Sequence, residues 1–373
     1  MRAKKKRNPF WLFLLVGFFA SGLCIFFFMQ YTKRFVASTT ITDSFKNATS
    51  SFVTSPTPPL IAIPSQKVLT NDYHIFQSFN NCGPAALSMA LSYYGITKSQ
   101  ETLGLALRPY QNPQGNNDDK SVTLEELAKK AQEYNLLAYH RPHGSIEILQ
   151  HFIAQDMPVI TRTLLKPNED IGHYRIVKGY DSVAQTIVQD DSLQGKNLIY
   201  SFDEFNQLWK QFNYEYLVLV PKENQAIAEQ ILGEDVDPKV AWSKAVALSN
   251  KTLEKNPDDT TVRFNLSIAY ANSGDYQKSV EEFEKVENRL PFRTLWYQIE
   301  PIQAYYELGN YERVFEITDK ILNNHNRAFS ELYIIRGNIY KKQGNIAQAR
   351  SEFEKAVFYN ENLNEAKEAL NSI

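Results

Sequence analysis

The stretch of sequence that decides the fold is residues 77–86, which read QSFNNCGPAA. From Cys82 onward, small and apolar residues recur every three or four positions as far as Gly95, so a helix is expected to begin at the cysteine. A helix N-terminus carries partial positive charge and free N–H groups, which favour a thiolate and can stabilise an oxyanion. We therefore expect Cys82 to be a nucleophile, with the side-chain amide of Gln77 as a further oxyanion donor.

A cysteine nucleophile needs a base and a group that orients the base. Among the six histidines, only His173 stands directly before a strand of the expected core. The hairpin expected over 174–189 brings Asp190 alongside His173, within about one residue of register. A slip of one residue would exchange Asp190 for Asp191, so Asp191 stays open as the alternative.

The pattern of residues 66–222 predicts an α+β domain, an N-terminal helical part followed by an antiparallel sheet. The expected helices are 82–94, 123–134, 145–155 and 202–210, and the expected strands are 136–140, 158–165, 174–180, 186–189 and 214–220.

Several motifs of this domain occur together in one known family: Gln77, Asn81-Cys82-Gly83-Pro84, Ser92-Tyr93-Tyr94-Gly95, His173 ahead of Gly179-Tyr180-Asp181, Asp190, and Phe202-Asp203-Glu204-Phe205. On these residues the domain resembles the bacteriocin-processing, double-glycine peptidases of the papain superfamily, which implies a papain-like fold. The resemblance implies Cys82 as nucleophile, His173 as base, Asp190 as orienting residue and Gln77 as oxyanion donor. Four residues separate Gln77 from Cys82, where transporter-linked members usually have five. No P-loop pattern occurs in the sequence, so specificity for double-glycine leaders is not carried over.

The tail, residues 223–373, contains an internal repeat. Gly274, Gly309 and Gly344 stand 35 residues apart, each after an aromatic-rich helical segment and before a second amphipathic one. This period is typical of stacked helix pairs and resembles the tetratricopeptide repeat. Val314 replaces the expected small residue, so the middle repeat is degenerate. We expect an all-α solenoid that docks a protein substrate or partner.

The N-terminus predicts a membrane anchor. Residues 10–29 are twenty uncharged, mostly apolar residues, enough to span a bilayer core of about 30 Å. Five basic residues precede this run, which places the N-terminus in the cytoplasm. We assign 1–34 to a basic tail with an uncleaved signal anchor, and 35–65 to a linker rich in Ser, Thr and Pro. A cleaved signal peptide is the alternative.

Composition limits the other classes of function. The net charge of −2 gives no reason to expect nucleic-acid binding, and the histidines lack the paired spacing of a metal site. No cofactor is expected. With Cys24 in the anchor, Cys82 has no disulfide partner in the rest of the chain. We therefore expect a single-pass bacterial membrane protein whose extracytoplasmic part is a cysteine peptidase. One alternative is an inactive or peptide-binding scaffold that uses the same fold. Another is a related acyl-transfer activity, since the same triad can cleave or form an amide.

Overall fold

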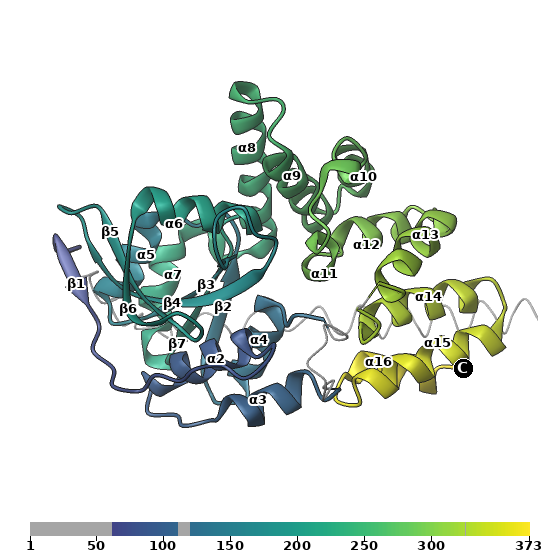
Figure 1. The fold of residues 1–373 in the computed structure, drawn as a ribbon, viewed down its shortest axis with the longest axis horizontal. Coiled ribbons are helices and arrows are strands. Elements are labelled where there is room, and N and C mark those ends of the chain that lie inside the picture. Colours follow the sequence, from purple (N-terminus) through teal and green to yellow (C-terminus); the bar gives the residue numbers. More distant parts are fainter. Residues whose placement is uncertain (1–61, 111–119, 325) are drawn as a thin grey trace, which may run out of the picture. The chain divides into compact units, whose positions relative to one another are not determined.

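The structure is a computed structural model that describes residues 62–110, 120–324 and 326–373. The expected anchor at 10–29 and most of the expected linker lie outside the described residues. Within the described ranges, no helix is both long and apolar enough to cross a bilayer. The described residues form one compact unit, in which an α+β region is followed by helices (Figure 1).

The α+β region is built on an antiparallel sheet with the strand order β2-β7-β3-β4-β5-β6, and β1 also pairs with β4. The strands are β1 (Gln66–Val68), β2 (Leu137–Arg141), β3 (Val159–Leu164), β4 (Gly172–Asp181), β5 (Thr186–Asp191), β6 (Gly195–Ser201) and β7 (Tyr216–Val220).

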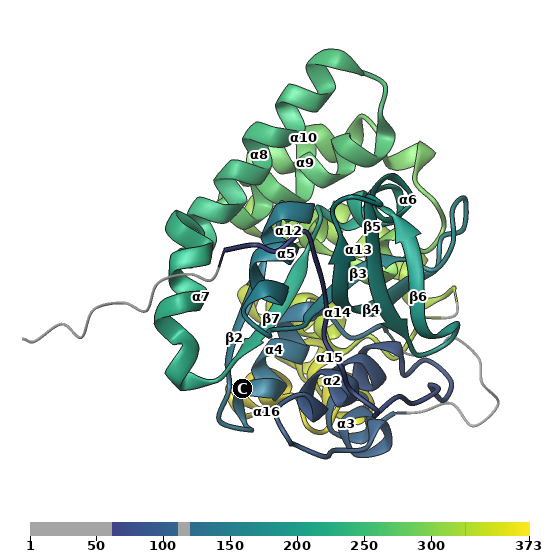
Figure 2. The same ribbon diagram turned by 90° about the vertical axis from the view of Figure 1, so that its left-hand side faces the viewer.

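Both faces of this sheet are covered by helices (Figure 2). Because successive side chains of a strand point to opposite faces, Ile160 and Ile176 belong to one core while Val159 and Val177 belong to the other. The first core includes α2 (Cys82–Ser92), α3 (Gln100–Leu107) and α4 (Leu124–Gln132), and the second includes α5 (Ile146–Ala154), α6 (Phe202–Trp209) and α7 (Gln225–Leu232).

Helix α2 is the central helix of the first core. Its residues from Cys82 to Leu91 are all buried, between α3, α4 and the sheet. A helix that is enclosed on all sides cannot shift without breaking core packing, so the residue that opens it has a fixed position. The expected α+β arrangement is confirmed. The structure adds β1, α3 and β6. The hydrophobic pattern does not predict the two strands because neither has a fully buried side chain.

The C-terminal part contains nine helices in the described residues: α8 (Pro238–Lys255), α9 (Thr260–Ser273), α10 (Tyr276–Glu284), α11 (Thr294–Tyr297), α12 (Glu300–Glu307), α13 (Tyr311–Leu322), α14 (Ser330–Lys342), α15 (Ile346–Tyr359) and α16 (Asn364–Asn371). Short 3-10 segments occur at Lys210–Phe212, Lys222–Asn224, Gly233–Val236 and Glu287–Arg289. The three repeat glycines have φ of +88°, +75° and +76°, and each lets the chain turn between paired helices. The expected helical repeats are therefore confirmed.

Candidate active site

Cys82 is the first residue of α2, and only 8% of its surface is exposed. The preceding residue, Asn81, is the N-cap, but its side chain does not cap the helix. Its Nδ2 donates to Ser78 Oγ at 2.8 Å, and its Oδ1 accepts from Arg108 Nη1 at 3.1 Å. The N–H groups of the first turn are therefore not taken by the N-cap side chain. The N–H of Gly83 donates to the Cys82 sulfur, as a thiolate requires.

His173 is the second residue of β4 and shares a hydrogen bond with the Cys82 thiol. Its Nε2 lies 2.9 Å from Asp191 Oδ1, which leaves Nδ1 as the ring nitrogen for the thiol. The side chain is almost fully buried. An imidazole held by a partner on each side is oriented to exchange a proton with Cys82 without rotating.

The structure corrects the choice between the two aspartates. Asp190 was expected beside His173, but its carboxylate forms a buried ion pair with Lys178 Nζ at 2.7 Å and accepts from the Asn197 N–H at 2.8 Å. Asp191, the alternative, is the residue that accepts from His173. The order of residue types along the chain is as expected, with the acid moved by one position.

A β-bulge explains the exchange. An uninterrupted hairpin that pairs Asp181 with Thr186 would place Asp190 opposite Val177. In the structure the register shifts between Val177 and Gly179, so that Val177 pairs with Gln189 and Arg175 pairs with Asp191. A one-residue shift moves the side chains of a strand to the other face, and Asp191 thereby replaces Asp190 on the face of His173.

The electrostatics favour a charged pair. Burial alone would raise the pKa of Cys82, but the hydrogen bond and charge of His173, with smaller contributions from Arg108 and the Gly83 N–H, bring that pKa below its ordinary value. Burial acts to lower the pKa of His173, yet the hydrogen bonds to Asp191 and Cys82 raise it overall. The pKa of Asp191 is lowered in spite of burial, first by the hydrogen bond from His173. A thiolate and an imidazolium stabilise each other in this arrangement.

Gln77 is half-buried and is tied to the residue that follows Asp191. Its backbone N–H donates to Ser192 O at 2.7 Å, and its side-chain Oε1 accepts from Ser192 Oγ at 2.8 Å. With Oε1 fixed in this way, the NH₂ end of the amide is the end left to face a ligand. This orientation suits a donor to an oxyanion, and the role of Gln77 stays a prediction.

Two buried arginines support the site and were missed in the sequence. Arg108 donates to Asn80 O and to Asn81 Oδ1, beside the start of α2. Arg175 Nε lies 3.1 Å from Asp191 Oδ2, and both side chains are fully buried. Arg175 stands two residues after His173, so strand alternation could have placed it on the same face. Arg108 follows a helix that was not expected, and no comparable signal points to it.

A large cavity lies between the α+β region and the helices that follow it. Its volume is about 1100 Å³, and its lining includes Lys120, Arg162 and Glu215 from the first region and Trp296 and Glu300 from the second. Neither Cys82 nor His173 lines it. The cavity is therefore separate from the site of the candidate chemistry.

The arrangement can perform nucleophilic acyl transfer. It contains a thiol with a lowered pKa at a helix start, an imidazole bonded to that thiol, a carboxylate bonded to the imidazole, and the Gln77 amide held by Ser192. In residues 62–110, 120–324 and 326–373, no group of His, Cys, Asp and Glu has an arrangement that could hold a metal ion.

The chain was compared with known families and proteins. Residues 61–217 match the Peptidase_C39 like family, and residues 260–288 and 330–363 match the tetratricopeptide repeat. The chain is thus similar to a C39-like peptidase domain over its first matched range and to tetratricopeptide repeats over the others. The middle repeat, with its Val314, falls outside the matched ranges. No curated protein matches the chain.

Three solved structures are similar to parts of the chain. A protein described as a C39-like peptidase from Bacillus anthracis is 20% identical, with a TM-score of 0.36, over 42% of this chain and 98% of that chain. The peptidase domain of Streptococcus ComA, a bi-functional ABC transporter involved in a quorum-sensing pathway, is 18% identical, with a TM-score of 0.32, over 40% and 97%. A thermophilic TPR protein from Thermus thermophilus is 19% identical, with a TM-score of 0.29, over 38% and 77%.

Proposed function

We propose that this chain is a cysteine peptidase that cleaves a peptide or protein substrate through Cys82, His173 and Asp191. The observation that carries the proposal is the continuous hydrogen-bonded series from the Cys82 thiol through the imidazole to Asp191, built at the start of a buried helix. A buried cysteine with only a structural role would need neither an oriented imidazole nor a buried carboxylate behind it. The match to the C39-like family supports the same activity.

The proposed reaction has two halves. The Cys82 thiolate attacks the carbonyl carbon of the scissile peptide bond, and the oxyanion that forms accepts from the Gln77 amide and from N–H groups at the start of α2. The His173 imidazolium gives its Nδ1 proton to the leaving amine, and a thioester remains. A water molecule then attacks the thioester while His173 takes its proton, and the C–S bond breaks to release the acid and the thiolate. Asp191 keeps the imidazole in its orientation throughout.

We further propose that the enzyme is anchored in the cell membrane by residues 10–29, with the peptidase domain and repeats outside the cytoplasm. The twenty uncharged residues and the basic residues before them support this topology. The helical repeats would dock the substrate or a partner protein, and the cavity between the repeats and the α+β region offers a polar and apolar lining for it. Recovery of the chain in the carbonate-washed membrane fraction is expected, and recovery in the soluble fraction would contradict the anchor.

The activity is tested first by alkylation of Cys82 with iodoacetamide, from about pH 4 to about pH 9, in a Cys24→Ser background that leaves one thiol. Fast alkylation is expected well below pH 8.5, the approximate pKa of an isolated thiol. His173→Ala should reduce the rate near pH 6 by about tenfold or more, because the thiolate loses its counter-charge. His151→Ala removes a histidine on α5 and is the matched control.

An ordinary thiol profile in the parent chain, unchanged by His173→Ala, would contradict a catalytic Cys82 and favour the scaffold. If the low-pH reactivity is present, a peptide library digested by the parent chain and by Cys82→Ala identifies the cleaved sequences. Cleavage products that persist with Cys82→Ala would show that the activity belongs to a contaminant.

A further inference from the structure

Helices outside the peptidase domain contact three segments that lead to active-site residues. Leu107 directly precedes Arg108, and Gly172 directly precedes His173. Lys120 lies two positions before Val122. Each contact is made by a different helix or turn of the repeat region. The contacts concern the same catalytic groups as the proposed function, so the inference below rests on that proposal.

The first contact holds the segment before His173. Tyr297, from α11, packs against Gly172: a Cβ on Gly172 would lie 3.3 Å from the Tyr297 ring, and the Gly172 N–H acts to lower the pKa of the Tyr297 hydroxyl. Two residues earlier, Asp170 pairs with Arg293 Nη1 at 2.6 Å. Arg162, on the neighbouring strand β3, donates to Tyr297 O at 3.1 Å and is buried. The backbone that enters β4 at His173 is thus fixed by one turn of the repeat region.

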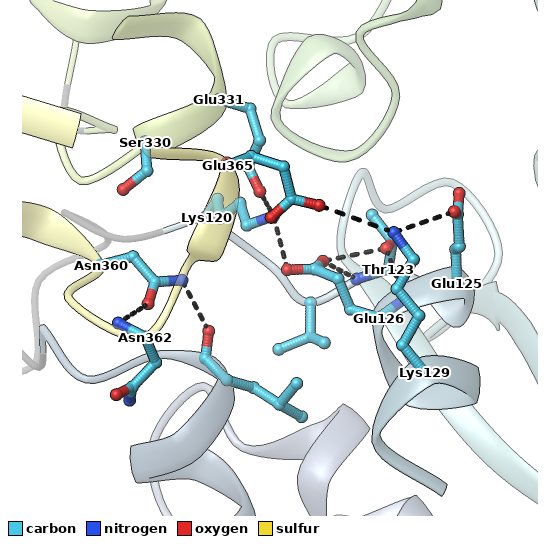
Figure 3. Close-up of polar contacts among 12 residues, drawn as sticks. Lys120, Thr123, Glu125, Glu126, Lys129, Ser330, Glu331, Asn360, Asn362 and Glu365 are labelled. Atoms are coloured by element: carbon cyan, nitrogen blue, oxygen red, sulfur yellow. Dashed lines mark hydrogen bonds and ion pairs between the residues drawn. The ribbon is translucent and has the colours of Figure 1, made fainter. Parts of the chain in front are cut away.

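The second contact holds the segment that begins at Lys120 (Figure 3). Lys120 is buried between Glu126, on α4, and Glu331, the second residue of α14, and its backbone N–H donates to Ala328 O at 3.4 Å. Two residues later, Val122 O accepts from the Tyr174 hydroxyl, and the Val122 side chain lies 3.5 Å from the Cβ position of Gly83. The wall against the first turn of α2 is therefore connected to α14.

The third contact holds the end of α3. Asn360 Nδ2, after α15, donates to Leu107 O at 3.2 Å, and Asn362 Nδ2 donates to Leu105 O at 3.0 Å. The next residue of the chain is Arg108, whose guanidinium donates to the two residues before Cys82. Its charge also helps to lower the pKa of Cys82. Asn360 and Lys120 both lie at this boundary (Figure 3).

We propose that the repeat region is a positioning part of the catalytic site, and that Tyr297, Glu331 and Asn360 hold the segments that align His173 with Cys82. The peptidase domain would then not reach its full reactivity without these contacts. A region that served only to dock other proteins would need no polar contacts next to the nucleophile and base. Tyr297 supplies a hydroxyl, Glu331 a carboxylate and Asn360 an amide. These residues lie in three separate parts of the repeat region, so three independent substitutions can test the proposal.

The test uses the purified chain with Cys24→Ser and the single substitutions Tyr297→Phe, Glu331→Gln and Asn360→Ala. The matched controls are Tyr306→Phe, Glu316→Gln and Asn324→Ala. They remove the same hydroxyl, carboxylate and amide from residues that contact other residues of the repeat region. The first readout is the NMR titration of His173 in chain labelled with ¹³C at histidine, assigned with His173→Ala. The second is the alkylation rate of Cys82 near pH 6.

We expect each test substitution to move the His173 titration and to slow alkylation by about threefold to tenfold, the effect of losing one hydrogen bond. The controls should leave both readouts unchanged. Test variants that stay folded by circular dichroism, with a His173 titration identical to that of the parent, would overturn the proposal. The titration can be measured whether or not the chain is active. An unchanged His173 titration would therefore contradict the positioning role of the repeats, whereas an ordinary alkylation profile of the parent would contradict the proposed peptidase activity.

Discussion

The carboxylate of Asp191 is held in the ionised form by four groups. Oδ1 accepts from His173 Nε2 and from the N–H groups of Leu193 and Gln194 at 2.7 and 2.9 Å, while Arg175 lies against Oδ2. A buried carboxylate without such donors would become protonated. Because it stays charged, it can stabilise the imidazolium form of His173.

Asp191→Asn should therefore weaken the thiolate–imidazolium pair without removing the imidazole. The amide cannot supply the negative charge, so the pKa of His173 falls. The acid limb of the Cys82 alkylation profile, where the rate rises with pH, should then move to higher pH by about one to two units. Alkylation rates measured as a function of pH check this expectation. An unchanged acid limb would show that Asp191 does not act on His173.

Asp190→Asn is the matched neighbour and should behave differently. It leaves the buried Lys178 ammonium without its counter-charge, which costs about 3–5 kcal/mol in the free energy of unfolding. The folded fraction should keep the low-pH reactivity of Cys82. If Asp190→Asn removed that reactivity and Asp191→Asn did not, the assignment from the sequence would be right after all.

At the scale of secondary structure, the bulge between β4 and β5 is the feature that sets the site. Gly179 stands at the register shift, and a Cβ there would lie 2.9 Å from Lys67 O of β1. The β1 strand covers this position and continues into Leu69, whose N–H donates to Lys178 O at 2.8 Å. Glycine is needed here because two backbones approach closely.

Gly179→Ala should destabilise the chain by about 1–3 kcal/mol and loosen β1, because the added methyl group overlaps the Lys67 backbone. Urea unfolding gives the first quantity, and faster exchange of the Leu69 amide hydrogen gives the second. Gly344→Ala is the control, because a Cβ at Gly344 would meet open space. Its only cost is the strain of alanine in the left-handed backbone conformation, about 1 kcal/mol. Normal protection of Leu69 in Gly179→Ala would contradict the argument.

At the scale of the whole molecule, charged groups are buried where the repeats meet the α+β region. Glu215, just before β7, is buried and contacts both His140 and Gln298. Glu300 on α12 has a buried Oε2 without a hydrogen-bond partner, and burial, with the charge of Glu215, raises its pKa to about 7. Arg162 and the Asn272 side chain act in the opposite direction.

This carboxyl should make stability depend on pH. Its pKa is raised from an ordinary 4.5 to about 7, so the folded chain binds the proton more tightly than the unfolded chain. The contribution of Glu300 is fully present below pH 4.5 and is lost as the pH rises through about 7. The loss is about 2 kcal/mol, after a reduction for the partial exposure of the side chain.

Glu300→Gln should remove this decline, because the amide does not ionise. The check is the free energy of unfolding in urea near pH 5 and near pH 8, for the parent and the variant. Glu307→Gln, an exposed change at the end of the same helix, is the control. An equal decline in the parent and in Glu300→Gln would place the titrating group elsewhere.

Much of this chain can be read from its sequence because the signals are local. The helix at Cys82, the core strands and the glycine period of the repeats all follow from periodicity and from the conformations that each residue type allows. That Cys82 opens a helix and that His173 stands at the start of a strand follow as well, since each depends on a few neighbouring residues. Their pairing is inferred from the base that a cysteine nucleophile needs. The anchor at 10–29 is also a local signal, and it stays a prediction.

The tertiary structure decided what depends on distant residues. The choice of Asp191 over Asp190 turns on a one-residue bulge beside β1, a strand that lies more than a hundred positions away in the chain and that periodicity does not reveal. The contacts of Tyr297, Glu331 and Asn360 join segments 125 or more residues apart. No local pattern encodes such pairs, because their energy arises only when packing excludes water from both partners at once.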